Sequence, residues 1–289
     1  MDLFSLAERK LSDIEFVAFD TEATGYSNFS DRVIEVAGVR FGRHDGAWAG
    51  GEWFAELADP ERRIPAETIA IHGITDDMVS SAPHVVDVLD RFFAFVGERV
   101  LVVHYAPSDV GFMAFAYARA GRDVPQTHVV DTFYLARKLI PNIPNYSLET
   151  LAKTLGLPEP THRALPDAIA TRALFEVCVT RLGAPEEVPF GSVLAQTGAP
   201  LTLEEFSQIP LTLPEILVPV DLAIANGLDV TLTYRGGSKG GMPRRVTPSH
   251  YFARQGHVFL EGYCHLSKEM KSFRIDRIES VSVVEIAPA

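Results

Sequence analysis

Two acidic residues, Asp20 and Glu22, follow an apolar run and are separated by a single residue. The run 16–19 is short and rich in aromatic and β-branched side chains, which predicts a buried strand that Gly25 closes. Because side chains alternate along a strand, Asp20 and Glu22 point to the same face. Carboxylate pairs repel each other, and oxygen ligands favour a hard cation such as Mg²⁺ or Mn²⁺. The pattern indicates a metal site, with two solvated turn carboxylates as the alternative.

Two later segments carry similar chemistry. Asp109 stands at the start of the helix that is expected after the apolar strand 99–103. The segment 162–167, His-Arg-Ala-Leu-Pro-Asp, puts His162 in a loop and Asp167 in the first turn of a helix, where negative charge is favoured. Each segment alone is consistent with a helix cap or a surface residue. Together with Asp20 and Glu22 they provide four carboxylates and one histidine.

The elements that must position these residues divide the chain into two patterns. Strands are predicted at 16–19, 32–41, 48–57, 99–103 and 129–132, and helices at 65–72, 85–96, 109–120, 148–155 and 167–181. Strands in a meander followed by alternating helices and strands predict an α/β domain with a mixed sheet. Short strands follow at 230–234, 244–248, 258–264, 272–275 and 281–286, which predict a small antiparallel barrel or sheet.

The domain boundaries follow from length and proline content. A chain of 289 residues is long enough for one large domain or two ordinary ones. Six prolines in the stretch after Leu182 indicate a linker that packs partly on the rest of the protein. We therefore expect a catalytic domain at 1–182, a proline-rich linker at 183–219 and a small β domain at 220–289.

Composition narrows the class of protein. Hydrophobic and charged contents of 47% and 22% are typical of a globular protein. The net charge of −12 argues against a protein that coats nucleic acid, although a bound metal would still let an acidic enzyme grip a few nucleotides. From residue 221 onward the balance is mildly basic, with nine Lys and Arg against seven Asp and Glu.

Cysteine usage and hydropathy indicate a cellular compartment. Cys178 and Cys264 are far apart in apolar surroundings, which favours buried free thiols in a reducing cytoplasm over a disulfide. No apolar run is long enough to cross a membrane, and the N-terminal residues contain no signal-peptide core. We therefore expect a cytoplasmic protein without a membrane partner.

The four carboxylates and the histidine, in this order on this pattern of strands and helices, resemble the DnaQ-like 3′–5′ exonucleases of the Asp-Glu-Asp-Asp superfamily. The resemblance covers 16–182 and is to the branch with a histidine before the last aspartate, most of all its proofreading subunits. Supporting segments are 71–75, 131–133 and 145–151. The resemblance implies a ribonuclease H-like mixed sheet flanked by helices.

The resemblance also implies roles for these residues. Asp20, Glu22, Asp109 and Asp167 would hold two ions, Mg²⁺ or Mn²⁺, which activate the attacking oxygen and stabilise the leaving oxygen. His162 would be the general base that takes the proton of the attacking water, a role that suits an imidazole near neutral pH. Its loop should be mobile so that it closes over the substrate. The expected product is a nucleoside 5′-monophosphate released from a 3′ end.

By the same resemblance, Ala23, Thr24, Gly25 and His72 would line the terminal nucleotide. The alternative for His72 is a helix-terminus residue without a ligand. One departure concerns the second motif, where the family usually has asparagine after the histidine and this chain has Tyr105. That residue is not a metal ligand, so the departure affects the expected local packing and substrate fit.

The C-terminal part, 220–286, resembles a WYL domain, although its naming tripeptide reads Val258-Phe259-Leu260. The resemblance implies a small Sm- or SH3-like barrel that binds nucleic acid or a nucleotide-like ligand. The candidate phosphate-binding side chains are all arginines, which suit phosphate oxygens: Arg244, Arg245, Arg274 and Arg277. Alternatively, they solvate the barrel surface or pair with nearby carboxylates.

Three functions remain in contention. The first is a two-metal 3′–5′ exonuclease, with single-stranded DNA favoured over RNA at the 3′ end, an appended binding domain, and a DNA polymerase or repair protein as its partner. The second is an RNA-specific 3′–5′ exoribonuclease, because contacts to the 2′-hydroxyl are not visible in motifs. The third is a non-catalytic nucleic-acid-binding regulator, which the complete set of carboxylates disfavours.

Overall fold

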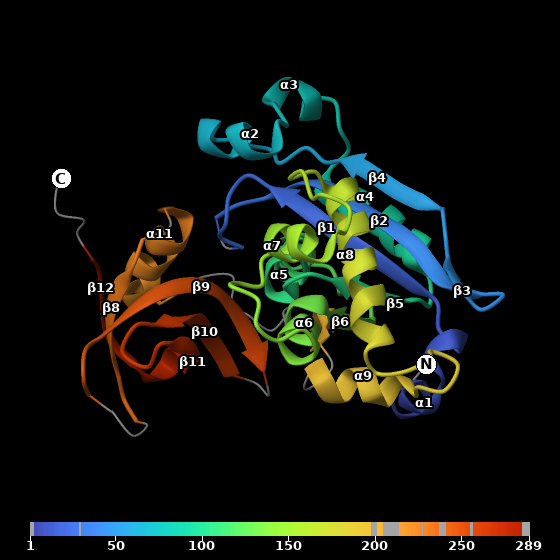
Figure 1. Cartoon of the computed structure of the whole chain (residues 1–289). Helices are drawn as coiled ribbons and strands as arrows, with labels where there is room; N and C mark the ends of the chain where they lie inside the picture. Colours follow the sequence, from blue (N-terminus) through green and yellow to red (C-terminus); the bar gives the residue numbers. More distant parts are fainter. Residues whose placement is uncertain are drawn as a thin grey trace. The chain divides into compact units, whose positions relative to one another are not determined.

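The computed structural model describes residues 3–28, 30–197, 201–204, 214–226, 228–236, 241–254 and 257–284. It divides into two compact units, one made of 1–24, 33–109 and 125–203, and the other of 25–32, 110–124 and 204–289 (Figure 1). All the predicted carboxylates and His162 belong to the first unit. No helix in the described ranges is long and apolar enough to span a membrane.

A mixed sheet forms the centre of the first unit, as the sequence predicts. Its strands are β1 (Phe16–Ala23), β2 (Val33–His44), β3 (Ala47–Ala49), β4 (Trp53–Leu57), β5 (Val100–Val103), β6 (His128–Asp131) and β7 (Leu201–Thr202). Their order is β3-β2-β1-β5-β6-β7, and β4 also pairs with β2. Strand β1 runs antiparallel to β2 and parallel to β5, so its carboxyl end meets the carboxyl end of β5 at one edge of the sheet.

The strand predicted at 48–57 is divided in two. β3 ends at Ala49 and β4 begins at Trp53, with Gly50 and Gly51 between them. A side chain at Gly50 would collide with the carbonyl oxygen of Arg40, so only glycine fits where the chain passes this close to β2.

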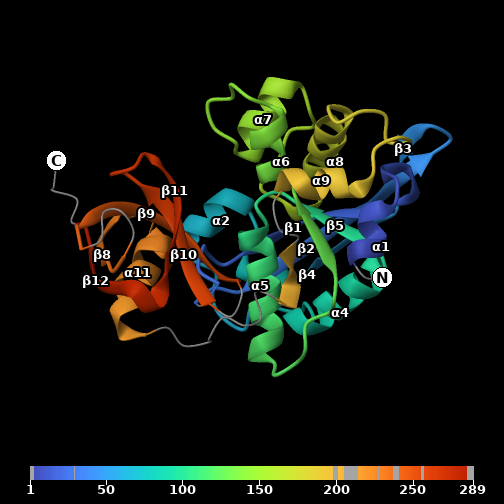
Figure 2. The same ribbon diagram turned by 90° about the horizontal axis from the view of Figure 1, so that it is seen from below.

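Helices cover both faces of this sheet. They are α1 (Leu3–Glu8), α2 (Ala66–His72), α3 (Asp76–Val79), α4 (Val85–Val96), α5 (Ala106–Arg119), α6 (Thr132–Leu139), α7 (Leu148–Leu155), α8 (Ala164–Thr180) and α9 (Phe190–Thr197), with a 3₁₀ turn at Leu11–Asp13. Figure 2 shows α6, α7 and α8 on one side of the sheet and α4 on the other. Helix α9 and strand β7 lie in the proline-rich stretch 183–219.

Alternation along β1 assigns its side chains to the two faces. Phe16 packs against Phe175 of α8 with ring centroids 4.9 Å apart, whereas Phe19 packs against Phe92 of α4 at 5.7 Å. Asp20 is an even number of residues from Phe16, so it faces α8. Phe16, Phe19 and Phe92 are fully buried, and burial of each aromatic ring stabilises this arrangement by about 2–3 kcal/mol.

The second unit contains an all-antiparallel sheet of five strands, β8 (Val230–Tyr234), β9 (Arg244–Arg254), β10 (His257–Cys264), β11 (Glu269–Arg274) and β12 (Ile278–Val283). Before it come a 3₁₀ turn (Glu215–Leu217) and α11 (Val218–Asn226), and a 3₁₀ turn (Ile275–Arg277) joins β11 to β12. The order is β11-β10-β9-β8-β12. The predicted β structure is therefore present, but the pairings among the described residues form an open sheet and do not close a barrel.

Candidate metal and active site

The carboxyl end of β1 carries the first two predicted ligands. Asp20 and Glu22 lie on the face of the sheet that α8 covers, because β1 continues without a bulge from Phe16 to Glu22. Asp167 lies in the first turn of α8. One carboxylate oxygen from each of Asp20, Glu22 and Asp167 lies within 4.8 Å of the other two. The structure thus brings together three side chains that are up to 147 positions apart in the sequence.

Asp167 is oriented by the loop that precedes α8. Its Oδ1 accepts a hydrogen bond of 2.7 Å from the backbone N–H of Thr161, and its own N–H donates to the carbonyl of Arg163. The helix begins at Ala164, three residues before the predicted start, so Asp167 stands near the positive end of the helix dipole. The buried carboxylate is therefore fixed by the same segment that carries His162.

Asp109, the fourth predicted ligand, reaches the site from α5. This helix begins at Ala106, earlier than predicted, because the Asp131 carboxylate accepts hydrogen bonds from the N–H groups of Tyr105 and Ala106. Oδ1 of Asp109 accepts from both the N–H (2.8 Å) and the hydroxyl (2.7 Å) of Thr21. Asp109 thus contacts the residue between Asp20 and Glu22, but it is not one of the three whose oxygens converge.

Burial and mutual repulsion raise the pKa values of these carboxyls, and the Arg163 charge offsets only part of this effect at Glu22. Burial raises the pKa of Asp20 well above its usual value, and the charges of Asp109 and Glu22 raise it further. Burial followed by repulsion from Asp167 raises the pKa of Glu22 to about 8. Burial raises that of Asp109 to about 7 against the effect of its Thr21 hydrogen bonds, and it also raises the pKa of Asp167. A divalent cation fits this set, because it supplies positive charge to clustered oxygen donors.

His162 lies beside this cluster but turns toward another partner. Its Nε2 is 2.9 Å from Oε1 of Glu149 on α7, and both side chains are at least half exposed. The backbone of His162 is in the left-handed region, with a φ of +54°, which is uncommon for a residue other than glycine. The structure therefore places the predicted base at the edge of the site on a locally strained backbone.

The predicted substrate-binding residues lie at the end of β1 (Ala23), in the bend that follows it (Thr24 and Gly25) and at the end of α2 (His72). The Thr68 hydroxyl of α2 donates to the carbonyl of Thr24 at 3.3 Å. His72 is buried, and its Nδ1 accepts from the N–H of Ile74 at 3.0 Å, so the proton of the neutral ring is on Nε2. Burial lowers the pKa of His72, and the Glu35 charge and a contact with the Ala23 carbonyl partly oppose this effect. Nε2 has no well-aligned hydrogen bond to any described residue.

Sequence reasoning missed one buried contact beside the cluster. Glu35, the one charged residue in the otherwise apolar segment 33–39 of β2, forms an ion pair with Arg163. It lies opposite Glu22 in the register of β1 and β2. A lone charge in a buried strand was the available signal, but its partner depends on a contact across 128 residues.

The four candidate arginines of the tail are engaged in different ways. Arg245 pairs with Asp229, and Arg274 donates to both oxygens of Asp276 at 2.9 and 2.6 Å. Arg244 lies over the rings of Tyr234 and Phe273, whereas the backbone carbonyl of Arg277 accepts from the N–H of Arg235. The alternative reading of pairing with nearby carboxylates thus holds for Arg245 and Arg274.

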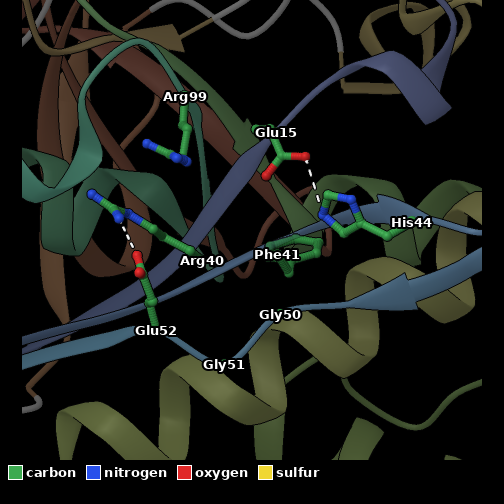
Figure 3. Close-up of a pocket in the computed structure, with 8 residues that line it drawn as sticks. All are labelled: Glu15, Arg40, Phe41, His44, Gly50, Gly51, Glu52 and Arg99. Carbon is green, nitrogen blue, oxygen red and sulfur yellow. Dashed lines mark hydrogen bonds and ion pairs between the residues drawn. The ribbon is translucent and has the colours of Figure 1, made fainter.

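A cavity of about 170 Å³ lies near the opposite end of β1 from the carboxylates (Figure 3). Its charged side chains are paired: Arg40 with Glu52, and His44 Nε2 with Oε1 of Glu15 at 3.4 Å. Arg99, which stands before β5, donates to the carbonyl of Val96. Four of the five charged or ionisable side chains that line the cavity are thus paired with one another, and the fifth, Arg99, contacts a backbone carbonyl.

Two curated relatives each match roughly two thirds of the chain. The chain is 41% identical over 184 residues to DNA polymerase III PolC-type of Oceanobacillus iheyensis, which covers 62% of this chain and 12% of that protein. It is 36% identical over 196 residues to a DNA polymerase III subunit epsilon-like protein of Rhodobacter capsulatus. This match covers 66% of this chain and 27% of that protein. The chain thus spans only a minor part of the length of these relatives.

Solved structures show a similar fold. The nuclease domain of 3′hExo, described as a DEDDh family member bound to rAMP, matches with a TM-score of 0.51 at 18% identity and covers 59% of this chain and 94% of that one. Escherichia coli exonuclease I in complex with a dA16 oligonucleotide matches with a TM-score of 0.53 at 16% identity. This match covers 86% of this chain and 55% of that one. At these identities the likeness establishes the fold alone.

Family models assign both parts of the chain. Residues 215–283 match the WYL domain. Residues 17–175, more than half of the chain, match the family described as "Exonuclease", of the RNase T type, whose fold uses divalent metal ions. This segment includes all four carboxylates and His162. The chain therefore belongs to the DnaQ-like exonuclease family and carries a WYL domain after it.

Proposed function

We propose that this protein is a 3′–5′ exonuclease that uses two divalent ions, Mg²⁺ or Mn²⁺, to release nucleoside 5′-monophosphates from single-stranded nucleic acid. The observation that carries the proposal is the convergence of Asp20, Glu22 and Asp167 within 4.8 Å, with burial and mutual repulsion that no side chain of the cluster compensates. Family membership supports the nuclease class. The direction, the product and the ion are parts of the proposal.

The carboxylates would divide the work of holding the ions. Asp20, Glu22 and Asp167 offer converging oxygens, and Asp109 would complete the set from α5 with the oxygen that Thr21 does not occupy. When bound, two divalent ions supply charge neutralisation at the phosphate and activation of water. The buried walls of the site strengthen these electrostatic interactions, because they exclude competing water.

His162 would act as the general base that accepts a proton from the attacking water. To do so, its imidazole must leave Glu149, 2.9 Å away, and turn toward the carboxylates. Both side chains are solvent-accessible, so their contact is a weak one of below about 1 kcal/mol and is readily exchanged for another. The loop that carries His162, which the family resemblance leads us to expect to be mobile, is attached to the cluster by the hydrogen bond from the N–H of Thr161 to Asp167.

The 3′-terminal nucleotide would lie against the turn Ala23–Gly25 and His72. The Nε2–H group of His72 is a buried donor without a well-aligned hydrogen bond to any described residue, and such groups are costly unless a ligand engages them. We expect a hydroxyl or phosphate oxygen of the terminal nucleotide to accept this hydrogen bond. DNA is the favoured substrate because the relatives are DNA polymerase III proteins. Their names also support a polymerase as partner.

We further propose a division of labour along the chain, with a catalytic domain at 1–182, a linker at 183–219 and a barrel-like WYL domain at 220–289 that binds nucleic acid or a nucleotide-like ligand. Within the tail, the candidate phosphate-binding side chains are Arg244, Arg245, Arg274 and Arg277, of which Arg245 and Arg274 contact the carboxylates of Asp229 and Asp276. A chain ending near Val220 should retain nuclease activity and lose affinity for long strands. Equal affinity for long and short strands in both chains would contradict a clamp role.

The proposal is tested with single-stranded DNA and RNA labelled at the 5′ end, incubated with Mg²⁺, Mn²⁺ or EDTA. We expect a metal-dependent ladder that shortens from the 3′ end, and the faster substrate identifies the preferred nucleic acid. Asp45→Asn is the matched control for variants that lack a carboxylate of the cluster, such as Asp20→Ala. Asp45 is exposed in a turn of the same unit, so its loss should leave the ladder unchanged. No ladder with either ion would favour the regulatory alternative.

A further inference from the structure

Glu35 is a buried carboxylate whose oxygens are both engaged by one segment. It is 6% exposed in the middle of β2, among Ile34, Val36 and Ala37, which are fully buried. Oε1 accepts a hydrogen bond of 2.6 Å from Nη2 of Arg163, and Oε2 accepts from its Nε at 3.0 Å. The same Oε2 accepts from the N–H of Ala164 at 2.9 Å.

These contacts distinguish Glu35 from the carboxylates of the cluster. A guanidinium fork and a peptide N–H occupy its two oxygens and balance its charge, so Glu35 is not available as a ligand. It is nevertheless adjacent to the cluster, since it pairs with Glu22 across β1 and β2. A buried, fully hydrogen-bonded ion pair fixes geometry because breaking it leaves an uncompensated charge.

The segment that Glu35 holds is the one on which the general base stands. Arg163 directly follows His162, and Ala164 is the first residue of α8. On the other side of His162, the N–H of Thr161 donates to Asp167 at 2.7 Å. His162 therefore lies between two anchors with its backbone in the left-handed region. Such a conformation persists only where the surroundings hold it in place.

We infer that Glu35 and Arg163 form a positioning pair that fixes the backbone of His162 next to the metal site while leaving the imidazole free to turn. The inference rests on the proposed function, because it assigns the pair to the exonuclease reaction. The pair touches neither substrate nor reacting atoms, so its effect on the reaction passes through His162. Loss of the pair should lower the reaction rate far more than it changes substrate binding.

The first test is steady-state kinetics of full-length Glu35→Gln on a 5′-labelled DNA oligonucleotide. Glutamine keeps the size of the side chain but loses the charge that matches the guanidinium. We expect kcat to fall by about 10- to 100-fold, as for other groups that orient a reacting side chain, with KM changed less than about threefold. The control is Glu176→Gln, which removes an ion pair with Arg172 on the same helix α8 and should leave kcat unchanged.

A double-mutant cycle separates positioning from general weakening of the fold. If Glu35 acts through His162, Glu35→Gln should lower kcat by about 10- to 100-fold when His162 is present. The same substitution in the His162→Ala background should lower kcat by less than about threefold. Equal factors in both backgrounds would overturn the inference, as would wild-type kcat in Glu35→Gln. Should Glu35→Gln not fold, Arg163→Lys takes its place in the cycle, since Arg163 is partly exposed and lysine keeps the charge but loses the fork.

The two levels of the proposal fail in different ways. A wild-type enzyme that degrades neither DNA nor RNA contradicts the proposed function itself. An active wild-type enzyme with an additive cycle leaves the proposed function intact and removes only the positioning role of Glu35 and Arg163.

Discussion

The charged side chains at the two ends of strand β1 differ in whether they have partners of opposite charge. At the amino end, Glu15 contacts His44, and the neighbouring pair Arg40 and Glu52 lines the same cavity. At the carboxyl end, Asp20 and Glu22 converge with a third carboxylate of α8, and burial and repulsion raise their pKa values. Both ends belong to the same unit and the same strand, so the contrast does not reflect different folds.

The contrast teaches how to tell structural charges from functional ones. A buried charge without a partner is costly, and natural proteins retain such charges chiefly where a ligand or reaction uses them. Charges that the protein balances itself contribute modestly to stability and need no ligand. By this criterion we propose a structural role for the charges at the amino end of β1 and a functional role for those at the carboxyl end. In the WYL part, Arg245 and Arg274 also pair with carboxylates, so a bound phosphate would have to displace these partners to reach them.

Replacing one carboxylate at the functional end should have the largest effect. Asp20→Ala is expected to lower the rate of cleavage by about 10³-fold or more, because the metal site loses a ligand while the fold remains. Glu52→Gln at the structural end should leave the rate within about twofold of wild type. Oligonucleotide cleavage and circular dichroism of both variants provide the measurements. Full activity of Asp20→Ala would remove the metal-ligand assignment.

Two histidines allow the same comparison. His162→Ala should slow turnover by about 10²- to 10⁴-fold, the usual contribution of a general base. His44→Ala at the amino end of β1 removes a similarly exposed imidazole with a carboxylate contact and should not change turnover. Single-turnover kinetics at saturating metal measure both rates. Equal rates for the two variants would exclude His162 from the mechanism.

The carboxyl pKa values predict how pH and metal act together. In the metal-free fold the pKa of Glu22 is about 8 and that of Asp109 about 7, both above their usual values near 4. Groups whose pKa is raised on folding stabilise the fold at low pH, and this stabilisation is lost as the pH rises through about 7 to 8. Mg²⁺ replaces these protons, so it should raise Tm more at about pH 8.5 than at about pH 6.

The corresponding experiment is thermal unfolding with EDTA or Mg²⁺ at both pH values. Asp20→Ala should show a smaller Mg²⁺-induced shift at the higher pH, because a ligand and a source of repulsion are both removed. A Mg²⁺ effect in wild type that is the same at both pH values would contradict the raised pKa values.

The smallest effect is expected from Arg40 at the structural end. Its guanidinium donates to the Phe95 carbonyl at 3.0 and 2.6 Å and lies 4.2 Å above the Phe95 ring. Arg40→Gln should lower the free energy of unfolding by about 1–2 kcal/mol without changing kcat. Urea unfolding followed by fluorescence measures this loss. If Arg40→Gln changed kcat and left the free energy of unfolding unchanged, the amino end of β1 would have a role in the reaction, and the assignment of a structural role to it would be wrong.

Much of the site was predictable because it depends on local rules. Alternation along 16–22 placed Asp20 and Glu22 on one face, and helix-start signals placed Asp109 and Asp167 near helix N-termini. The convergence of Asp20, Glu22 and Asp167 required, in addition, the resemblance to a known family. The predicted mixed sheet and the β structure of the tail are confirmed, whereas the strand pairings of the described residues do not close a barrel.

What the sequence did not predict depends on contacts between distant segments. The pairing of Glu35 with Arg163 requires the register of β1 and β2 and the seating of α8, neither of which has a local signal. The early start of α5 depends on Asp131 of β6. Tyr105, where the family usually has asparagine, has a φ of +73°, a conformation that asparagine adopts more readily. The replacement of the usual asparagine by Tyr105 therefore places a bulky side chain at a backbone position that strains it.

The most direct test of the central claim, that the uncompensated carboxylates hold divalent cations, is calorimetric titration of Mn²⁺ into the EDTA-treated full-length protein at about pH 8. We expect wild type to bind two ions per chain, Glu52→Gln to bind as wild type does, and Asp20→Ala to lose at least one ion. Failure of wild type to bind Mn²⁺, or identical binding by Asp20→Ala, would contradict the account.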